Sequence, residues 1–490
     1  MMRVIGNDES LPRQEHAVAS GALTDGTPVV INADGTVSVV SGNDDAAGTP
    51  ADISSESNLS QAQAIYDPDT GKVVIAYHRD AHTHYYGAAV VGTVSGTSIS
   101  FGSITKFQPN NTQGMQGLTL AYDTNEDKVL IAYADKDNST YGTAIVGTVS
   151  GTSISFGTAS VWQSNSINRI QLGFDNNSNK FLVAYMRNFP QSRVLTVSGT
   201  SISAGSETKI RSDNDGNIFR PDMAFSTSAN KFVVVYKDND QSGKGQVVVS
   251  TISGTSVSHG TVADIGSVAV ASILAIAYDA SLDKFLVVYV DSDDSDKGKA
   301  VVGTLSGTSV SFGTPAVFND AATINPGVQA DGSGNFIIAF TDDANSDYKT
   351  FVSATVSGTT PSFGSEVVIE AVDAEAGGSQ ALPRMAYDSA NDKFVLAYND
   401  FTNTKLKGVV LQLASTNLTS ENYIGIARSG AADGAGAIID TQGAIADNLS
   451  SLTAGQSYFV QNDGTLGTTA DDPSVFAGTA VSATKLIVKG

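Results

Sequence analysis

One pattern recurs seven times in this chain and constrains its fold more than any other feature. It has an apolar–aromatic–Asp start, a polar turn, and an apolar run that ends in an aromatic residue. The copies read AIYDPDTGKVVIAY, LAYDTNEDKVLIAY, LGFDNNSNKFLVAY, MAFSTSANKFVVVY, IAYDASLDKFLVVY, VQADGSGNFIIAF and MAYDSANDKFVLAY. Their closing aromatics are Tyr77, Tyr133, Tyr185, Tyr236, Tyr289, Phe340 and Tyr398, 51 to 58 residues apart. Self-similarity at such a period predicts one supersecondary unit per copy.

A second motif follows each of the first six copies and predicts a hairpin. It reads SGTSISFG at Ser95 and Ser150, SGTSISAG at Ser198, SGTSVSHG at Ser253, SGTSVSFG at Ser306 and SGTTPSFG at Ser357. Each motif lies between two β-rich runs, and its glycine accepts the positive φ that two-residue hairpin turns require. Because the first pattern is also a hairpin with a polar turn, each copy predicts four antiparallel strands in meander order.

The second strand of each copy is apolar on both faces, as in KFLVAY at residues 180–185. An antiparallel strand with one face in water would alternate apolar and polar residues, so both faces must be covered. The sequence therefore predicts an all-β fold, a seven-bladed β-propeller of four-stranded antiparallel blades in which each blade is covered by its two neighbours. An open stack, or a ring of six or eight blades, is the alternative.

The two ends of the repeats favour a closed ring. The seventh copy has a third strand, LKGVVLQL at residues 406–413, but no SGT motif follows it. A candidate for the missing fourth strand, GTVSVVSG at residues 35–42, precedes the first copy. We expect this N-terminal strand to complete the last blade.

The repeats stop near Thr416, and the remaining chain predicts a small β-sandwich or barrel module. The expected boundaries are an N-terminal extension at 1–26, the propeller at 27–415 and the C-terminal module at 416–490. One feature leaves the first boundary open, because LTDGTPVVINADGTV from Leu23 matches LTAGQSYFVQNDGTL from Leu452. Both segments predict the same hairpin, so residues 20–42 are alternatively part of the C-terminal module.

The composition excludes several classes of partner and site. A net charge of −22, with no run of Lys or Arg, argues against nucleic-acid binding. The absence of cysteine excludes disulfides and thiolate metal sites. Of the 50 acidic residues, 41 are Asp rather than the helix-favouring Glu, so we expect few helices. No apolar run approaches the roughly 20 residues of a membrane span, and the N-terminus lacks the apolar core of a secretory signal.

The repeats and the C-terminal end resemble a known group of proteins. The VVGTVSGTSISFG repeats resemble the propeller repeats of structural proteins from tailed bacteriophages. The ending, YIGIA…SLTAGQSYFVQNDGTLGTT…AGTAVSATKLIVKG, is similar to small β modules that close phage tail and head-surface proteins. The N-terminus departs from a complete fibre, because it shows no coiled-coil or triple-helical shaft.

This resemblance implies a non-enzymatic virion protein, such as a tail fibre, a receptor-binding protein or a surface decoration. Its propeller would present one loop face to a host glycan or protein, or to a neighbouring virion subunit. The expected partners are other virion proteins and a host surface receptor, in a homo-oligomer made in the host cytoplasm and located on the virion. A bacterial extracellular or cell-surface lectin-like propeller is the main alternative, and a glycan hydrolase is the more distant one.

Two clusters are candidate metal sites. The loop VDSDDSD contributes Asp291, Asp293, Asp294 and Asp296, and clustered carboxylates suit Ca²⁺, which takes six to eight oxygen ligands. These Asp side chains alternatively cap the N–H groups of turns. In HRDAHTHYY, His82 and His84 project from the same side of an extended segment and could share a transition metal. An exposed polar loop is the alternative there.

Two further groups are candidate binding residues. Four aromatic residues lie in loops that would share one rim of the ring, where they could stack on a sugar or a protein: Trp162, Tyr85, Tyr86 and Phe189. Packing between blades explains these residues equally well. Arg169, Arg220 and Arg384 precede first strands and could bind a carboxylate near the axis. The sequence shows no persuasive pair of catalytic acids of the kind that glycosidases need, so we expect no enzyme and no catalytic residue.

Overall fold

The computed structural model describes residues 13–56, 59–81, 84–211, 218–239, 242–373, 384–471 and 473–489. In these ranges the chain is strand and turn, with two 3-10 turns, η1 (Lys136–Asn138) and η2 (Asp343–Asn345), and no α-helix. The predicted all-β fold of antiparallel sheets is confirmed. Nothing in the described part of the chain is a helix able to cross a membrane. The chain divides into two compact units, the repeat region Asp45–Gln412 and a terminal unit formed by Met1–Asp44 with Leu413–Gly490.

Each sequence repeat forms one antiparallel unit of the repeat region, numbered here in chain order. Repeat unit 1 contains β7 (Leu59–Asp67), β8 (Lys72–Ala81), β9 (His84–Ser95), β10 (Ser98–Phe101) and β11 (Thr105–Asn111). Repeat unit 2 contains β12 (Met115–Asp123), β13 (Lys128–Asp135), β14 (Tyr141–Ser150), β15 (Ser153–Phe156) and β16 (Ser160–Ser166). Repeat unit 3 contains β17 (Asn168–Asp175), β18 (Lys180–Met186), β19 (Pro190–Ser198), β20 (Ser201–Ala204) and β21 (Thr208–Lys209).

The remaining repeat units share some long strands. Repeat unit 4 contains β22 (Ile218–Ser226), β23 (Lys231–Asp238), β24 (Lys244–Ser253), β25 (Ser256–His259) and the start of β26 (Ala263–Asp279). Repeat unit 5 contains the rest of β26, β27 (Lys284–Asp291), β28 (Lys297–Ser306), β29 (Ser309–Phe312) and the start of β30 (Ala316–Ala330). Repeat unit 6 contains the rest of β30, β31 (Asn335–Asp342), β32 (Tyr348–Ser357), β33 (Thr360–Phe363) and β34 (Val367–Asp373). Repeat unit 7 contains β35 (Ala386–Asp388), β36 (Lys393–Asp400), β37 (Lys405–Gln412), β5 (Ala46–Ala47) and β6 (Ala51–Ser54).

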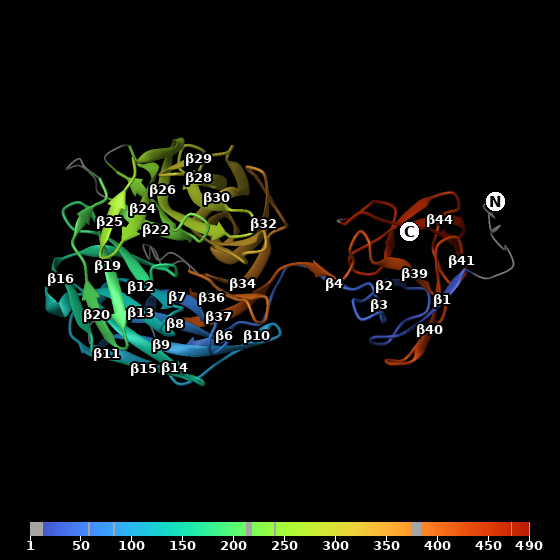
Figure 1. The fold of residues 1–490 in the computed structure, drawn as a ribbon, viewed down its shortest axis with the longest axis horizontal. Helices are drawn as coiled ribbons and strands as arrows, with labels where there is room; N and C mark the ends of the chain where they lie inside the picture. The colour runs from blue at the N-terminus through green and yellow to red at the C-terminus, as the bar shows by residue number, and fades with distance from the viewer. Residues whose placement is uncertain are drawn as a thin grey trace, which may run out of the picture. The chain divides into compact units, whose positions relative to one another are not determined.

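All units share one pairing scheme. The first strand pairs with the second, the second with the third, and the third with two short segments that together make the fourth strand. In repeat unit 2, for example, β14 pairs with β15 and, further along, with β16. The meander order expected from the sequence is therefore present, with the fourth strand broken in two. Figure 1 shows the units following one another from blue through green and yellow to orange.

The fourth strand of repeat unit 7 comes from the N-terminal side of the chain, but not from the predicted residues. β37 pairs with β5 through Leu411↔Ala47 and with β6 through Gly408↔Ala51. The predicted strand at residues 35–42 is wrong, because β3 (Val37–Val39) pairs with β2 (Pro28–Ile31) and buries Val37 in the core of the terminal unit. The repeat region accordingly begins at Asp45 rather than at the expected residue 27.

The residues that recur in the sequence have defined structural roles. Asp67 Oδ1 accepts the backbone N–H groups of Asp69 (3.1 Å) and Thr70 (3.2 Å), which closes the turn into the second strand. The same buried cap is made by Asp123, Asp175, Asp279 and Asp388. The glycine of the six SGT motifs has a φ between 59° and 63°, as the hairpin prediction requires.

The second strands are buried on both faces because each lies between two neighbouring units. Along β8, Val73 and Tyr77 share a hydrophobic cluster with Val395 of repeat unit 7. Val74, on the opposite face, shares another cluster with Val129 of repeat unit 2. The apolar runs in the sequence are therefore explained by burial between units, as predicted.

A glycine in the fourth strand brings each unit close to the next. A Cβ added at Gly102, between β10 and β11, would overlap the carbonyl oxygen of Thr152 in the SGT turn of repeat unit 2. Matching overlaps occur at Gly205 with Thr255, Gly260 with Thr308 and Gly313 with Thr359. A Cβ at Gly48, between β5 and β6, would overlap Thr97 of repeat unit 1 in the same way. Repeat units 7 and 1 thus meet through the contact that joins successive units.

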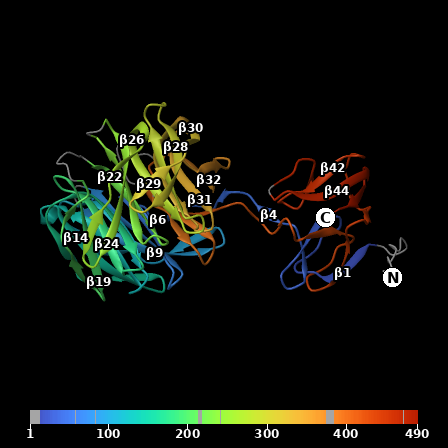
Figure 2. The same cartoon turned by 45° about the horizontal axis from the view of Figure 1, so that its top comes forward.

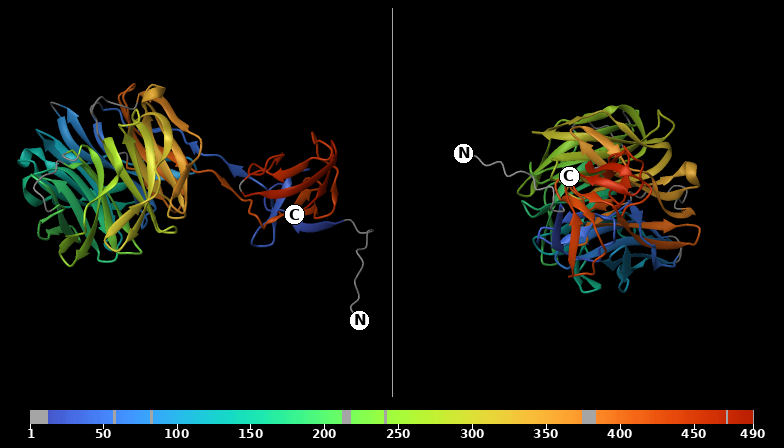
Figure 3. Two further views of the ribbon diagram at one scale, coloured as in Figure 1. Left: turned by 90° about the horizontal axis from the view of Figure 1, so that it is seen from above. Right: turned by 90° about the vertical axis from the view of Figure 1, so that its right-hand side faces the viewer.

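The terminal unit contains two five-stranded antiparallel sheets. One has the order β1 (Gln14–Val18), β40 (Gly436–Asp440), β39 (Tyr423–Ala427), β2 and β3. The other has the order β41 (Ile445–Ala446), β45 (Lys485–Val488), β44 (Val475–Ser482), β42 (Ser457–Val460) and β43 (Leu466–Gly467). A separate pair joins β4 (Gly42–Asn43) to β38 (Ser415–Thr416). β2 thus pairs with the C-terminal strand β39, and β3 joins the same sheet through β2, in line with the alternative interpretation of the sequence. Figures 2 and 3 show these blue strands among the red ones.

The two sheets of the terminal unit repeat one chain path. In chain order, β1, β2, β3, β39 and β40 take the sheet positions that β41, β42, β43, β44 and β45 take in the other sheet. The two matching hairpins end in the same turn, because Asp34 Oδ1 accepts the N–H of Thr36 (2.9 Å) and Asp463 Oδ1 accepts that of Thr465 (2.8 Å). The repeat region is therefore inserted between the third and fourth strands of the first copy.

Candidate binding site

The first strands of the repeat units lie next to one another, so residues at matching positions come together. β12 contacts β7 and β17, β22 contacts β17 and β26, and β35 contacts β30 and β7. Between repeat units 1 and 7, Ala64 N donates a hydrogen bond of 3.2 Å to Arg384 O. Polar residues on these strands are thus placed to form a common site.

Six of the first strands, β7, β12, β17, β22, β26 and β30, carry a register shift against the second strand. The described residues with positive φ in these shifts are Gln61 (52°), Gly117 (66°), Arg169 (52°), Arg220 (51°) and Asn325 (47°). A bulge of this kind redirects a side chain out of the regular strand. The left-handed conformation costs a non-glycine residue roughly 1–3 kcal/mol, and such residues cluster at ligand sites.

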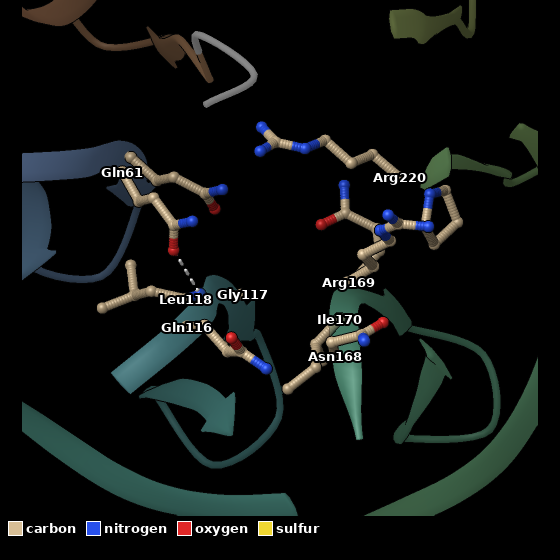
Figure 4. Close-up of a pocket in the computed structure, with 11 residues that line it drawn as sticks. Gln61, Gln116, Gly117, Leu118, Asn168, Arg169, Ile170 and Arg220 are labelled. Atoms are coloured by element: carbon tan, nitrogen blue, oxygen red, sulfur yellow. Dashed lines mark hydrogen bonds between the residues drawn. The ribbon is translucent and has the colours of Figure 1, made fainter. Parts of the chain in front are cut away.

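The bulges of β7, β12, β17 and β22 line a pocket of about 320 Å³, here called the central pocket. It is lined by Gln61, Gln63, Gln116, Gly117, Leu118, Asn168, Arg169, Ile170, Gln171, Arg220 and Pro221. Figure 4 shows Arg220 reaching across the pocket toward the side that carries Gln61. Strands of four successive repeat units therefore supply one concave, polar surface.

Two arginines give the central pocket a positive charge. Burial lowers the pKa of Arg169, and burial together with the nearby Arg169 guanidinium lowers the pKa of Arg220 to about 10. Arg220 is still protonated at neutral pH, so two like charges are held close together. The described lining residues include no carboxylate.

The carboxamides of the pocket are held in part by the backbone. Leu118 N donates to Gln61 Oε1 (3.0 Å), and Gln116 Nε2 donates to Ile167 O (3.3 Å). Gln63 is only 6% exposed, and its Oε1 has no hydrogen-bond partner among the described residues. A buried oxygen without a donor costs roughly 1–3 kcal/mol, and Gln63 is one of the residues that line the pocket.

A buried polar network follows the bulges along the first strands. Thr119 Oγ1 donates to Gln171 Oε1 (2.9 Å), and Gln171 Nε2 donates to Asp222. Asp222 also accepts the N–H of Ile276 (3.0 Å) and forms an ion pair with Arg384. Burial raises the pKa of Asp222, whereas Arg384 opposes this rise. The network ties together repeat units 2, 3, 4, 5 and 7.

A second pocket, of about 220 Å³, lies further along the same strands. Its lining residues include the apolar Ile65, Met223 and Phe225 together with Asp222 and Arg384 of the network. Both charged groups are already engaged with each other. The central pocket is therefore the more suitable site for a charged ligand.

The structure brings together two of the three predicted arginines. Arg169 and Arg220 line the central pocket, whereas Arg384 does not, because it pairs with Asp222. The sequence interpretation missed Gln61, Gln63, Gln116, Asn168 and Gln171. A partial signal was available, because Gln61 lies at the repeat position of Arg169 and Arg220, and Gln63 and Gln171 lie at that of Arg384.

The predicted aromatic binding surface is wrong for two of its residues. Trp162 is only 4% exposed and packs against the ring of Tyr185, with centroids 5.1 Å apart. Tyr86 is only 3% exposed. Tyr85 and Phe189 are partly exposed but do not line the central pocket. Packing between units, rather than ligand binding, accounts for the two buried rings.

The structure does not bring the four Asp residues of the predicted Ca²⁺ loop together as ligands. Lys299 Nζ lies 2.7 Å from both Asp291 Oδ2 and Asp294 Oδ2, so the lysine ammonium occupies the position between these carboxylates that a metal ion would take. Asp293 accepts a backbone N–H across the loop, and Asp296 lies at a φ of 58° in the turn. No group of three or more His, Asp or Glu side chains in the described part of the chain could hold a metal. Ion pairing and turn capping explain these carboxylates.

The predicted histidine pair is only partly described. His82 lies outside the described residues. The backbone of His84 begins β9 and pairs with Ala81 of β8. The transition-metal hypothesis therefore gains no support from the described residues.

Comparisons with known proteins identify no family for this chain. No family model and no curated protein matches it. Among solved structures, it is similar to the NanB sialidase from Streptococcus pneumoniae in complex with 2-[(3-chlorobenzyl)ammonio]ethanesulfonate. The identity is 9%, the TM-score is 0.43, and the match covers 74% of this chain and 69% of that one. A likeness at this level carries no argument about activity or ligand.

Proposed function

We propose that this chain is a non-enzymatic virion surface protein that binds an anionic host glycan through a closed seven-bladed β-propeller. The central pocket is the binding site in this proposal. The terminal unit attaches the protein to other virion proteins and supports a homo-oligomer.

Three contacts between repeat units 7 and 1 support closure of the ring. These are the hydrogen bond from Ala64 N to Arg384 O, the approach of Gly48 to Thr97, and the hydrophobic cluster shared by Tyr77 and Val395. The pair between Asp222 and Arg384 also joins repeat units 4 and 7, which are far apart in the sequence. An open row would leave its first and last units too far apart for these contacts.

The observation that carries the binding proposal is the charge of the central pocket. Arg169 and Arg220 converge there, and the described lining offers no carboxylate to act as a catalytic acid, base or nucleophile. Glycosidases generally need two such groups beside the scissile bond. The arrangement therefore favours recognition of an acidic glycan over its cleavage.

A panel of immobilised bacterial surface polysaccharides, acidic and neutral, tests this function with the full-length chain. We expect binding to acidic members without release of reducing ends, and a loss of binding in the double variant Arg169→Gln, Arg220→Gln. Arg187→Gln is the matched control, because Arg187 pairs with Glu207 at 3.1 Å and does not line the pocket. Release of reducing ends would refute the proposal. Equal binding to acidic and neutral polysaccharides that the double substitution does not weaken would also refute it. Labelling of intact virions with an antibody to the chain tests its location.

A further inference from the structure

The two arginines of the central pocket favour a planar anion. Arg169 and Arg220 occupy matching bulge positions on neighbouring first strands, β17 and β22. The guanidinium fork matches a carboxylate through two parallel hydrogen bonds, whereas a lysine would offer a point charge. The bulges direct both forks into one pocket, so a single carboxylate can be bound by either or both.

The uncharged part of the pocket favours a ligand with hydroxyl groups. Five carboxamides line it, and a carboxamide carries both donors and an acceptor, although Gln61 Oε1 and both polar atoms of Gln171 already bond within the protein. A sugar hydroxyl, which also donates and accepts, satisfies such a surface. Gln63 Oε1 also favours a hydroxyl group, because this oxygen is buried and lacks a donor among the described residues. Sulfate has no hydrogen to give this atom, whereas a ring hydroxyl has.

The size and apolar contacts of the pocket favour one sugar ring. Small-molecule sites span roughly 300–1,000 Å³, and the central pocket, at about 320 Å³, lies at the lower end. Leu118, Ile170 and Pro221 offer apolar surface for the C–H groups of a ring. The described lining contains no aromatic side chain on which a longer glycan would stack.

We propose that the central pocket binds the carboxylated ring of an acidic monosaccharide, a uronic or sialic acid residue at the end of a glycan. The carboxylate lies against Arg169 and Arg220, and a ring hydroxyl donates to Gln63 Oε1. This inference rests on the proposed function for its biological setting, but the chemistry of the pocket alone carries the choice of ligand.

Calorimetric titration of the full-length chain with sodium glucuronate and N-acetylneuraminate tests this inference. Glucose is the neutral matched probe, and sodium sulfate is the matched anion without hydroxyl groups. We expect at least one acidic sugar to bind at least tenfold more tightly than glucose and sulfate. Arg220→Gln should weaken that binding at least tenfold, and Arg187→Gln should leave it unchanged.

Gln63→Leu separates the hydroxyl contact from the charge. This near-isosteric change removes the acceptor, so we expect the acidic sugar to bind about 3–10-fold more weakly, the range of one neutral hydrogen bond. Binding of sulfate should not change, which also shows that the variant is folded. An equal loss for sulfate would overturn the assignment of Gln63.

Three outcomes would overturn the inference as a whole: sulfate binding as tightly as both acidic sugars, glucose binding as tightly, or no acidic sugar binding at all. These outcomes are distinct from failure of the proposed function. If acidic polysaccharides bind and neither free sugar competes, the function stands and the monosaccharide inference fails. If a free sugar binds and no polysaccharide or virion is recognised, the inference stands and the function fails.

Discussion

His259 gives a quantitative test of the packing between repeat units 3 and 4. The matching position of the other SGT motifs is occupied by Phe101, Phe156, Ala204, Phe312 and Phe363. His259 Nε2 lies 2.9 Å from Ser192 Oγ of repeat unit 3, and Nδ1 lies 2.9 Å from Ser250 Oγ. Burial lowers the pKa of His259 from its ordinary value of 6.5 to about 4. Neither ring nitrogen has a carboxylate as its partner in these two bonds.

The lowered pKa of His259 makes stability depend on pH in a defined direction. Below pH 6.5 the unfolded chain takes up a proton on this imidazole, which the native protein accepts only near pH 4. The contribution of neutral His259 is therefore complete above pH 6.5 and is lost as the pH falls toward 4. At roughly 1.4 kcal/mol per pH unit, a change from pH 7.5 to pH 5 costs about 2 kcal/mol.

Calorimetry of the wild type and of His259→Phe at both pH values measures this cost. Unfolding a region of roughly 370 residues has an entropy near 0.8 kcal/mol/K, so about 2 kcal/mol corresponds to a Tm change of about 2–3 °C. We expect the wild type to lose that much more than the variant between pH 7.5 and pH 5. The carboxylates common to both proteins cancel in the comparison. Equal losses in the two proteins would refute the argument.

Three further predictions test the architecture. Asp222→Ala should destabilise the repeat region by about 3–5 kcal/mol in urea unfolding, because it leaves Arg384 charged and without its ion-pair partner. The control Asp52→Ala breaks the exposed pair with Lys405 and should cost about 1 kcal/mol or less. Equal effects would contradict the central role of the network. Gly102→Ala should lower stability by about 1–3 kcal/mol in urea unfolding, because the added Cβ overlaps the Thr152 carbonyl. Gly436→Ala, where an added Cβ meets nothing within 4 Å, should be close to neutral in the same measurement. Replacing residues 44–414 by a two-residue Gly-Gly turn should leave a folded terminal unit, because Asn43 and Ser415 pair directly. Circular dichroism measures this, and loss of the β-sheet signal would show that the terminal unit depends on the inserted repeat region.

The repeat made the strand order predictable, but the closing strand of repeat unit 7 was missed. The sequence search used the SGT motif, which repeat unit 7 lacks. A subtler signal was present, because AGTPA at residues 47–51 matches FGTPA at residues 312–316 in repeat unit 5. The glycine in both segments packs against the SGT turn of the next unit. The structure shows that this glycine, rather than the preceding hairpin, marks the fourth strand.

The aromatic at the position of Trp162 was misread because its partner lies on another strand. A Cβ at Gly142 of β14 would meet the indole of Trp162, so the glycine makes room for the ring. Gly87 and Gly298 make the same room for Phe107 and Phe318. In three of the third strands, a glycine after the start of the strand thus lies opposite a buried aromatic residue. Such a pairing is visible in a sequence only after the register of the two strands is known.

The site could not be predicted in full because it is formed at positions where the repeats carry different residues. Turn and contact positions keep the same residues from unit to unit, since each is packed against one neighbour in the same way. The first strands lie next to one another, so identical side chains at one position of every repeat would repel or exclude one another. Here the matching positions hold Gln63, Thr119, Gln171, Asp222, Ala275, Gly327 and Arg384.

This difference between positions has a functional consequence. One acid at the centre is satisfied by one arginine, and the adjacent bulges place the remaining two arginines on one side, beside carboxamides rather than carboxylates. In the proposed closed ring, a strict repeat would suit only a ligand of matching symmetry, whereas the unequal residues of this chain form one cationic pocket that suits an asymmetric ligand. The double variant Arg169→Gln, Arg220→Gln should therefore lose binding to acidic glycans and keep the melting temperature of the wild type, whereas Gly102→Ala should lower the melting temperature without changing a residue of the pocket.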